Sequence, residues 1–257
     1  MTTTAALTSA FDLTGKVALV TGSSRGLGRS IAGALAAAGA DLVIVSRNQD
    51  ACDVAAREIT ELTGVRTMAH ACHVSHWDEL DCLVDAVYER FGRVDVLVNN
   101  AGKSPLYESL LDITEELWNS VLGVNLLGPF RLSTLIGTRM ADAGSGSIIN
   151  ISTVGSVLAE PSYLPYAAAK SGLNTITRAF AKSFAPAVRV NCIMPGPFRT
   201  DIMASWSDDQ IAGMSRRLPL GRVGEPADID GAVLWLAGGA SAYVTGQVFA
   251  VDGGMSA

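Results

Sequence analysis

Short apolar segments alternate with helical segments along the whole chain, and this alternation limits the possible folds more than any other feature. Seven segments are expected to be buried strands, at residues 16–20, 42–45, 66–72, 94–98, 147–151, 188–193 and 247–251. The sequence between them has helical patterns, at residues 26–38, 50–62, 77–91, 114–140, 163–184 and 227–237. Strands that alternate with helices in this way form a parallel sheet with helices on both faces.

Right-handed crossovers between such strands predict a doubly wound, Rossmann-type α/β fold. The chain has 257 residues and no evident linker, low-complexity tract or internal repeat. We therefore expect one domain over residues 13–257, preceded by a flexible N-terminal segment at residues 1–12. Ligands of such sheets bind beyond the carboxyl ends of the strands, so the residues directly after each strand are the first candidates for a functional site.

The composition narrows the range of partners. Nineteen Lys and Arg against 25 Asp and Glu give a net charge of −6 and a pI near 5.0, which argues against nucleic-acid binding. Charged residues are only 17% of the chain, below the usual ~25%, which favours an oligomer with part of its surface covered. No signal-peptide pattern, uninterrupted apolar span or cysteine framework is evident, so we expect a cytoplasmic protein with no membrane contact.

A glycine-rich loop, TGSSRGLG at residues 21–28, joins the first strand to the first helix. Glycines allow the backbone to approach a pyrophosphate, and the helix N-terminus presents free N–H groups and partial positive charge. The spacing differs from the commonest dinucleotide fingerprint, and such a turn can also serve only to pack a helix on a strand. The strand–turn–helix context favours nucleotide binding, with contacts from Gly22, Ser24, Arg25, Gly26, Leu27 and Gly28.

Two other patterns suggest different chemistry. Residues 22–26 also match the Gly-x-Ser-x-Gly elbow of hydrolases, but the histidines follow within 60 residues, with no room for the intervening sheet and acid. A metal site at His70, Cys72, His73 and His76 is disfavoured, because strand alternation separates these side chains and no carboxylate cluster completes the set. We therefore expect no nucleophilic serine and no metal.

Tyr166 and Lys170 are four residues apart in a helical pattern, so their side chains share one helix face. An ordinary tyrosine titrates near ~10, and a neighbouring ammonium lowers that pKa toward the range useful for proton transfer. Such a pair also occurs by chance. Here the helix follows the fifth strand, whose end supplies the hydroxyls of Ser152 and Thr153 beside the same crevice. The pattern predicts Tyr166 as a proton donor.

Six motifs occur in order: the TGSSRGLG loop, NNAG at 99–102, Asn125 in a long helix, YAAAK at 166–170, PGPFRT at 195–200 and VDGG at 251–254. With them the chain resembles the short-chain dehydrogenase/reductase family from about Leu13 to Gly254. The resemblance implies a nicotinamide-dependent oxidoreductase, most like the 3-oxoacyl-carrier-protein reductases and related ketone reductases. It also implies a homotetramer.

The resemblance implies a role for each matching residue. Tyr166 would be the general acid/base, and Lys170 would hold the ribose hydroxyls of the nicotinamide half and lower the pKa of Tyr166. Asn125 would bind a water that links Lys170 to solvent. The remaining cofactor contacts would come from Asn100, Ala101 and Gly102 beside the adenosine ribose, and from Pro195, Gly196, Phe198 and Thr200 around the nicotinamide.

The sequence departs from the family pattern at two positions. The family usually places an Asp against the adenine, where this chain has His73, so adenine binding is expected to rest on the backbone of Val74. The serine that orients the substrate normally lies thirteen residues before the tyrosine, and here that position is Thr153. Ser152 is the competing hydroxyl, but adjacent strand residues face opposite ways and only one of the two can point into the crevice.

Cofactor choice is expected to depend on the end of the second strand, where an acidic residue would bind an NAD ribose. This chain has Ser46 and Arg47 there, and Asp41 lies at the beginning of the strand. Arg47, with Arg25 of the glycine loop, suits a 2′-phosphate through its planar guanidinium, although either side chain can simply be solvated. We therefore expect NADP(H) in preference to NAD(H).

Residues 201–220 match the position of the family's substrate lid. Its apolar side chains suggest a partly hydrophobic substrate, or equally the packing of the lid or of a subunit interface: Ile202, Met203, Trp206, Ile211 and Met214. The predicted function is hydride transfer between NADP(H) and a carbonyl or secondary alcohol. An NAD-dependent sugar or polyol dehydrogenase is the alternative. A non-catalytic nucleotide sensor or scaffold is a third possibility, which the retained Tyr166 and Lys170 argue against.

Overall fold

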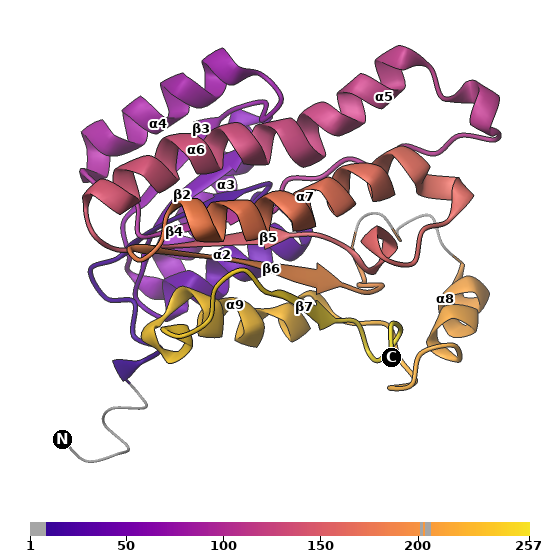
Figure 1. Ribbon diagram of the computed structural model, residues 1–257. Helices are drawn as coiled ribbons and strands as arrows, with labels where there is room; N and C mark the ends of the chain where they lie inside the picture. Colours follow the sequence, from indigo (N-terminus) through magenta and orange to yellow (C-terminus); the bar gives the residue numbers. More distant parts are fainter. Residues whose placement is uncertain (1–8, 201–202, 204–206) are drawn as a thin grey trace.

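The computed structural model describes residues 9–200, 203 and 207–257 (Figure 1). The described residues form a parallel sheet in the order β3-β2-β1-β4-β5-β6-β7. The predicted doubly wound sheet is therefore confirmed, and each strand end lies within two residues of its predicted position. The strands are β1 (Val17–Thr21), β2 (Asp41–Ser46), β3 (Thr67–Ala71), β4 (Val96–Asn99), β5 (Gly146–Ile151), β6 (Val188–Pro195) and β7 (Val248–Val251).

Helices cover both faces of the sheet (Figure 1). One face packs against α2 (Gly26–Ala37), α3 (Gln49–Thr63) and α9 (Asp230–Ala237), and the other against α4 (Trp77–Phe91), α6 (Gly128–Asp142) and α7 (Leu164–Ser183). Alternate side chains of β1 enter the two cores, Ala18 on the first side and Leu19 on the second. Burial on both faces explains why the strands read as continuous apolar runs.

The long helix predicted at residues 114–140 is interrupted. The chain forms α5 (Glu115–Leu122), a five-residue π-helical segment (Gly123–Leu127) and then α6. The β3–α4 loop packs tightly here: a Cβ on Gly123 would lie 2.9 Å from that of Ser75, and one on Gly128 would lie 2.3 Å from the Val74 carbonyl oxygen. The wider turn places Asn125 inside the protein, and periodicity alone does not reveal it.

The helical run Glu115–Asp142 is long and apolar enough to cross a membrane by those two criteria alone. However, 56% of its most apolar window is buried inside the molecule. Its neighbours are α4, α7 and β5. This burial is typical of a core helix.

Candidate active site

A cleft with a volume of about 1120 Å³ opens at the carboxyl ends of the strands. It is large enough for a dinucleotide and a small substrate together. Of the predicted site residues, only Asn125 is absent from its lining. The cleft is lined by Gly22, Ser24, Arg25, Gly26, Leu27, Gly28, Ser46, Arg47, His73, Val74, Asn100, Ala101, Gly102, Thr153, Tyr166, Lys170, Pro195, Gly196, Phe198 and Thr200.

The glycine loop at one end of the cleft has a shape that only glycine permits. Gly22 and Gly26 have positive φ angles of 68° and 56°. A Cβ on Gly28 would lie 2.2 Å from the Gly22 carbonyl oxygen and 2.4 Å from the Asn100 Nδ2 atom. Arg25 at the N-cap of α2 makes no side-chain capping bond, so the first N–H groups of the helix have no cap from it. The donors and the helix dipole suit a pyrophosphate, so this part of the cleft fits a dinucleotide.

Asn100 holds this loop against the end of β4. Its Nδ2 atom donates to the carbonyl oxygens of Thr21 (2.8 Å) and Gly22 (3.3 Å). The Thr21 hydroxyl in turn accepts from the backbone N–H groups of Asn100 and Ala101, both at 3.0 Å. These bonds brace the central sheet at the predicted position. Thr200 lies next to the same loop, since its side chain would be 3.9 Å from a Cβ placed on Gly26.

Tyr166, Lys170 and Thr153 meet on the wall formed by the end of β5 and the first turns of α7. The Lys170 side chain is only 2% exposed, and its Nζ atom lies 5.8 Å from the centre of the Tyr166 ring. Nζ donates to the Ile151 carbonyl oxygen at 2.6 Å. The Thr153 hydroxyl lies near the phenol of Tyr166, close enough to lower its pKa. The i, i+4 spacing places the side chains of Tyr166 and Lys170 on one face of α7.

Burial dominates the ionisation of this pair. Desolvation raises the pKa of Tyr166 to about 12, and the hydrogen bond from Thr153 opposes it only weakly. Desolvation also lowers the pKa of Lys170 to about 8. We expected Lys170 to lower the pKa of Tyr166, but burial raises it instead. Lys170 has little effect on this pKa because its Nζ atom donates to the Ile151 carbonyl oxygen. The cleft keeps the phenol protonated at neutral pH.

The two hydroxyls at the end of β5 face opposite ways, as strand alternation requires. Ser152 is 3% exposed and donates to the Lys170 carbonyl oxygen at 3.3 Å, inside the protein. Thr153 is half-buried on the cleft side, and its Oγ1 atom accepts from the Gly155 N–H at 3.2 Å. This bond uses one lone pair of the Thr153 hydroxyl, and its proton can be donated to an oxygen in the cleft.

Asn125 lies behind the cleft rather than on its surface. It is fully buried, and its Nδ2 atom donates to the carbonyl oxygens of Lys103 (2.8 Å) and Val121 (2.9 Å). Its Oδ1 atom accepts from the Lys103 N–H at 3.2 Å and would lie 3.3 Å from a Cβ on Gly102. In this arrangement Asn125 fixes the chain that follows the NNAG motif.

Of the three histidines, His73 lines the cleft, just after the end of β3. The His73 ring stacks on His76 with centroids 4.5 Å apart, and its Nδ1 atom lies 2.7 Å from the Ser75 hydroxyl. Glu79 accepts from the His73 N–H at 2.6 Å and pairs with His76 at 2.7 Å. Desolvation and the nearby charge of His76 lower the pKa of His73. No group of three possible metal ligands occurs among the residues that the structure describes.

Ser46 and Arg47 lie beside this cluster at the carboxyl end of β2. The Ser46 hydroxyl donates to the Asn48 carbonyl oxygen at 3.3 Å. Arg47 is exposed in the cleft and close enough to His73 for its charge to contribute to the lowered pKa of that imidazole. Arg25 on the glycine loop is also exposed and lines the same cleft. The cleft lining therefore contains two guanidinium groups at the positions that the sequence singled out.

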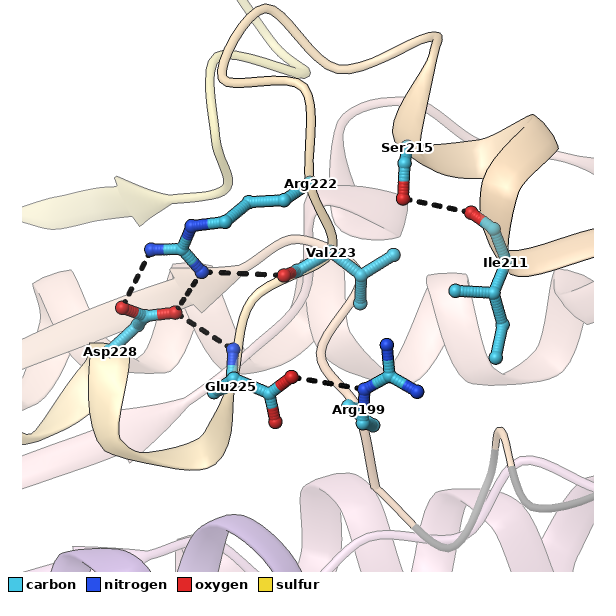
Figure 2. A network of polar contacts seen from close by, with 7 residues as sticks. All are labelled: Arg199, Ile211, Ser215, Arg222, Val223, Glu225 and Asp228. Carbon is cyan, nitrogen blue, oxygen red and sulfur yellow. Dashed lines mark hydrogen bonds and ion pairs between the residues drawn. The ribbon is translucent and has the colours of Figure 1, made fainter. Parts of the chain in front are cut away.

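The predicted lid segment is flanked by a network of polar contacts, shown in Figure 2. Before the lid, Arg199 donates to Glu225 at 3.0 Å, and its N–H bonds the Gly224 carbonyl oxygen at 2.7 Å. After the lid, Arg222 pairs with Asp228, which also accepts from the Glu225 N–H at 2.8 Å. These contacts hold together the two ends of the segment.

Part of the predicted lid can be compared with the structure. Met203 packs with Leu218, Val223, Ile211 and Met214 in a small apolar cluster that includes α8 (Asp208–Ser215). Ile211 and Met214 thus pack the lid itself, one of the three expected roles. Ile202 and Trp206 lie outside the described residues.

Several residues that line the cleft were not predicted from the sequence. They are Asn48, Ala51, Cys72, Lys103, Ser104, Val124, Ile151, Val154, Gly155, Tyr163, Pro197 and Met255. Most are neighbours of predicted residues, and Lys103 directly follows the NNAG motif. Met255 directly follows VDGG, and this position just after a motif is the signal that could have found it.

Comparisons with known proteins agree with this geometry. A family model described as enoyl-(acyl carrier protein) reductase matches residues 22–256. A 3-oxoacyl-(acyl-carrier-protein) reductase from Chlamydia muridarum is 39% identical, over 95% of this chain and 98% of that protein. Human dehydrogenase/reductase SDR family member 4 is 34% identical, over 94% and 88%.

Solved structures match equally well. A gluconate 5-dehydrogenase from Burkholderia cenocepacia, in complex with NADP and tartrate, superposes with a TM-score of 0.92 at 33% identity, covering 97% of this chain and 98% of that one. An NADPH-dependent 3-quinuclidinone reductase from Rhodotorula rubra gives 0.91 at 28% identity, covering 97% and 94%. The chain therefore belongs to the short-chain dehydrogenase/reductase family, whose members are NAD(P)-dependent oxidoreductases.

Proposed function

We propose that this enzyme interconverts ketones and secondary alcohols with NADP(H), and that Tyr166 handles the proton. The observation that carries the proposal is the wall of Thr153, Tyr166 and Lys170 in a cleft that begins at the glycine loop. A panel of ketones and secondary alcohols tests it, with either cofactor, by following absorbance of the reduced nicotinamide. No turnover of any member of the panel with either cofactor would contradict it.

Each residue of the wall has one role in this proposal. The cofactor, when bound, supplies or accepts the hydride. Tyr166 gives its phenolic proton to the carbonyl oxygen of the substrate, and the Thr153 hydroxyl donates a hydrogen bond to the same oxygen. Lys170 offers ammonium protons to ribose hydroxyls. Asn125 supports the segment after NNAG and, as the resemblance implies, a water that relays protons from Lys170.

The lining near Thr153 favours a neutral, partly apolar ketone. The described residues of the cleft lining include Gly155, Tyr163, Pro197, Met203 and Met255, none of which is charged. Lys103 also lines the cleft, and its ammonium group donates to the Ser120 hydroxyl at 2.6 Å. The 3-oxoacyl reductases fit this description. A sugar or polyol dehydrogenase is the second candidate, because gluconate dehydrogenases are among the structural relatives.

NADPH is expected to bind more tightly than NADH, because Arg25 and Arg47 line the cleft and can bind a 2′-phosphate. In addition, β2 ends with Ser46 and not with the acidic residue that would bind an NAD ribose. The change Arg47→Ala should narrow that difference by about tenfold, the loss of one charge-assisted contact. Quenching of protein fluorescence on titration with each cofactor measures it. Arg29→Ala is the control, since Arg29 pairs with Glu58 at 3.0 Å and does not line the cleft. Tighter NADH binding by the wild type would refute the assignment.

The two directions of the reaction should respond differently to pH. Reduction uses the neutral phenol, which is present throughout the accessible range because the pKa of Tyr166 is raised to about 12. Oxidation uses the phenolate, whose fraction rises with pH at every value below that pKa. Lys170 holds the ribose hydroxyls only as an ammonium, and burial lowers its pKa to about 8. The rate of reduction should therefore stay constant below that pKa and fall above it, while the rate of oxidation rises from pH 6 to 8. Profiles of kcat/KM in both directions measure this, and reduction that rises over pH 6–8 would contradict it.

A homotetramer is expected, and an aromatic row on the α4–α6–α7 side supports the proposal. Phe130 is 39% exposed, stacks on Phe180 at 5.6 Å and lies 6.3 Å from Trp77. Closed symmetry would pair such a face with its copy. Light scattering should report a tetramer for the wild type and smaller species for Phe130→Glu. Val54→Glu on α3 is the control for an added charge on another exposed apolar residue. A stable wild-type monomer at micromolar concentration would overturn this expectation.

The remaining expectations follow from the same picture. We propose a cytoplasmic enzyme of one domain that acts on small molecules, without nucleic-acid or membrane partners. The acidic balance of 25 Asp and Glu against 19 Lys and Arg supports this view. The intact wall of Thr153, Tyr166 and Lys170 argues against a non-catalytic sensor, because binding alone needs no proton donor.

A further inference from the structure

Asn174 lies on the helix face that carries Tyr166 and Lys170, yet it belongs to none of the six motifs. It follows Lys170 by four residues on α7, so the three side chains form one stripe. The residue is 6% exposed, and its amide meets two other polar side chains inside the protein. These are Cys192 on β6 and Ser156 in the turn after β5.

The bonds of Asn174 form a directed chain that ends at Thr153. The Cys192 thiol donates to Asn174 Oδ1 at 3.5 Å, and Asn174 Nδ2 donates to the Ser156 hydroxyl at 2.8 Å. The Ser156 hydroxyl then donates to the Thr153 carbonyl oxygen at 2.7 Å. Each donor meets an acceptor, which fixes the orientation of the amide. A chain of hydrogen bonds between buried and half-buried groups rigidifies the segments that it joins.

The chain controls the backbone from which the Thr153 hydroxyl projects. The Thr153 carbonyl oxygen is held by Ser156, and its Oγ1 atom accepts from the Gly155 N–H at 3.2 Å. The Ser171 hydroxyl, also on α7, donates to the Ser156 carbonyl oxygen at 2.7 Å. The turn that carries Thr153 is thus tied to the helix that carries Tyr166. A small rotation of this turn would move the hydroxyl away from the oxygen that both residues must reach.

We propose that Asn174 is a positioning residue, which acts through Ser156 to hold the Thr153 hydroxyl beside Tyr166. The proposal rests on the function assigned to Thr153 above. Asn174 itself touches no reacting atom. Its removal therefore changes turnover only through Thr153, and it leaves cofactor binding at the glycine loop unaltered.

A double-mutant cycle on the full-length enzyme tests this coupling. Asn174→Ala should lower kcat about tenfold in the wild-type background, within the range for residues in one hydrogen-bond network. In the Thr153→Val background the same change should lower kcat less than about twofold, because the hydroxyl that it positions is gone. Ser156→Ala should reproduce both results and serves if Asn174→Ala does not fold. The Kd for NADPH should be unchanged in all variants.

A matched control separates positioning from a loss of stability. Thr177→Val removes another buried polar contact of α7, the bond that Asn150 Nδ2 donates at 2.8 Å, and it should lower Tm without coupling to Thr153. Equal losses of kcat from Asn174→Ala in both backgrounds would overturn the proposal and leave the role of Thr153 intact. Full activity of Thr153→Val would instead overturn the assigned role of Thr153, and with it this inference.

Discussion

The variant Tyr166→Phe is expected to lose at least about 100-fold in kcat while it still binds NADPH. Phenylalanine keeps the ring and its packing against the Lys170 side chain but removes the proton that the substrate oxygen receives. Burial raises the pKa of Tyr166 to about 12, so the phenol of the wild type is protonated at neutral pH. The variant has no proton donor at this position. Stopped-flow or steady-state turnover, combined with fluorescence titration of NADPH, separates the two effects.

Tyr88→Phe is the matched control for that experiment. Tyr88 is a partly buried tyrosine of α4, remote from the cleft lining, and its pKa is also raised by burial. Removing its hydroxyl should leave kcat within about twofold of the wild type, as for a change away from the site. Turnover of Tyr166→Phe close to the wild-type value would overturn the proposed mechanism.

The second large effect is expected at Thr153. Valine matches threonine in shape but lacks the hydroxyl, so Thr153→Val should lose roughly 2–3 kcal/mol of transition-state stabilisation, or about 30- to 150-fold in kcat. The reason is geometric: Oγ1 accepts from the Gly155 N–H at 3.2 Å, and the hydroxyl lies near the Tyr166 phenol, where it can donate to the same substrate oxygen. Measurement of kcat and KM for one ketone substrate gives the loss.

Two neighbouring changes control for the hydroxyl itself. Thr153→Ser keeps the donor, frees χ1 and should keep or improve activity. Ser152→Ala should be mild, because the Ser152 hydroxyl donates to the Lys170 carbonyl oxygen inside the protein. The reverse pattern, with Ser152→Ala severe and Thr153→Val tolerated, would show that the donor has been assigned to the wrong residue.

The sequence predicts the fold well because its strands are buried on both sides. Alternate residues of β1, such as Ala18 and Leu19, enter different cores, so the strand is apolar throughout and stands out from the helices around it. The break at Gly123–Leu127 was missed, because it is set by the approach of Ser75 and Val74 from a distant loop. A periodicity of 3.6 residues carries no information about such a contact.

The candidate site was predictable where a motif specifies the backbone. Gly28 is required because a Cβ there would lie 2.2 Å from the Gly22 carbonyl oxygen, and the motif records that constraint directly. Side-chain direction was less accessible. The sequence places Lys170 near Tyr166 but does not reveal that its Nζ atom donates to Ile151. Nor does it join Asn174 to Ser156, since their contact depends on how β5 and α7 pack.

The paired bonds at the base of the lid have a consequence for the length of the segment between them. The Arg199 N–H donates to the Gly224 carbonyl oxygen at 2.7 Å, and the Gly224 N–H donates to the Pro197 carbonyl oxygen at 3.0 Å, so the two ends are held close together. Because loop-closure entropy grows only slowly with length, insertions and deletions between these points cost little folding free energy. The length of this segment can therefore change at little cost in stability, while the contacts at its two ends stay the same.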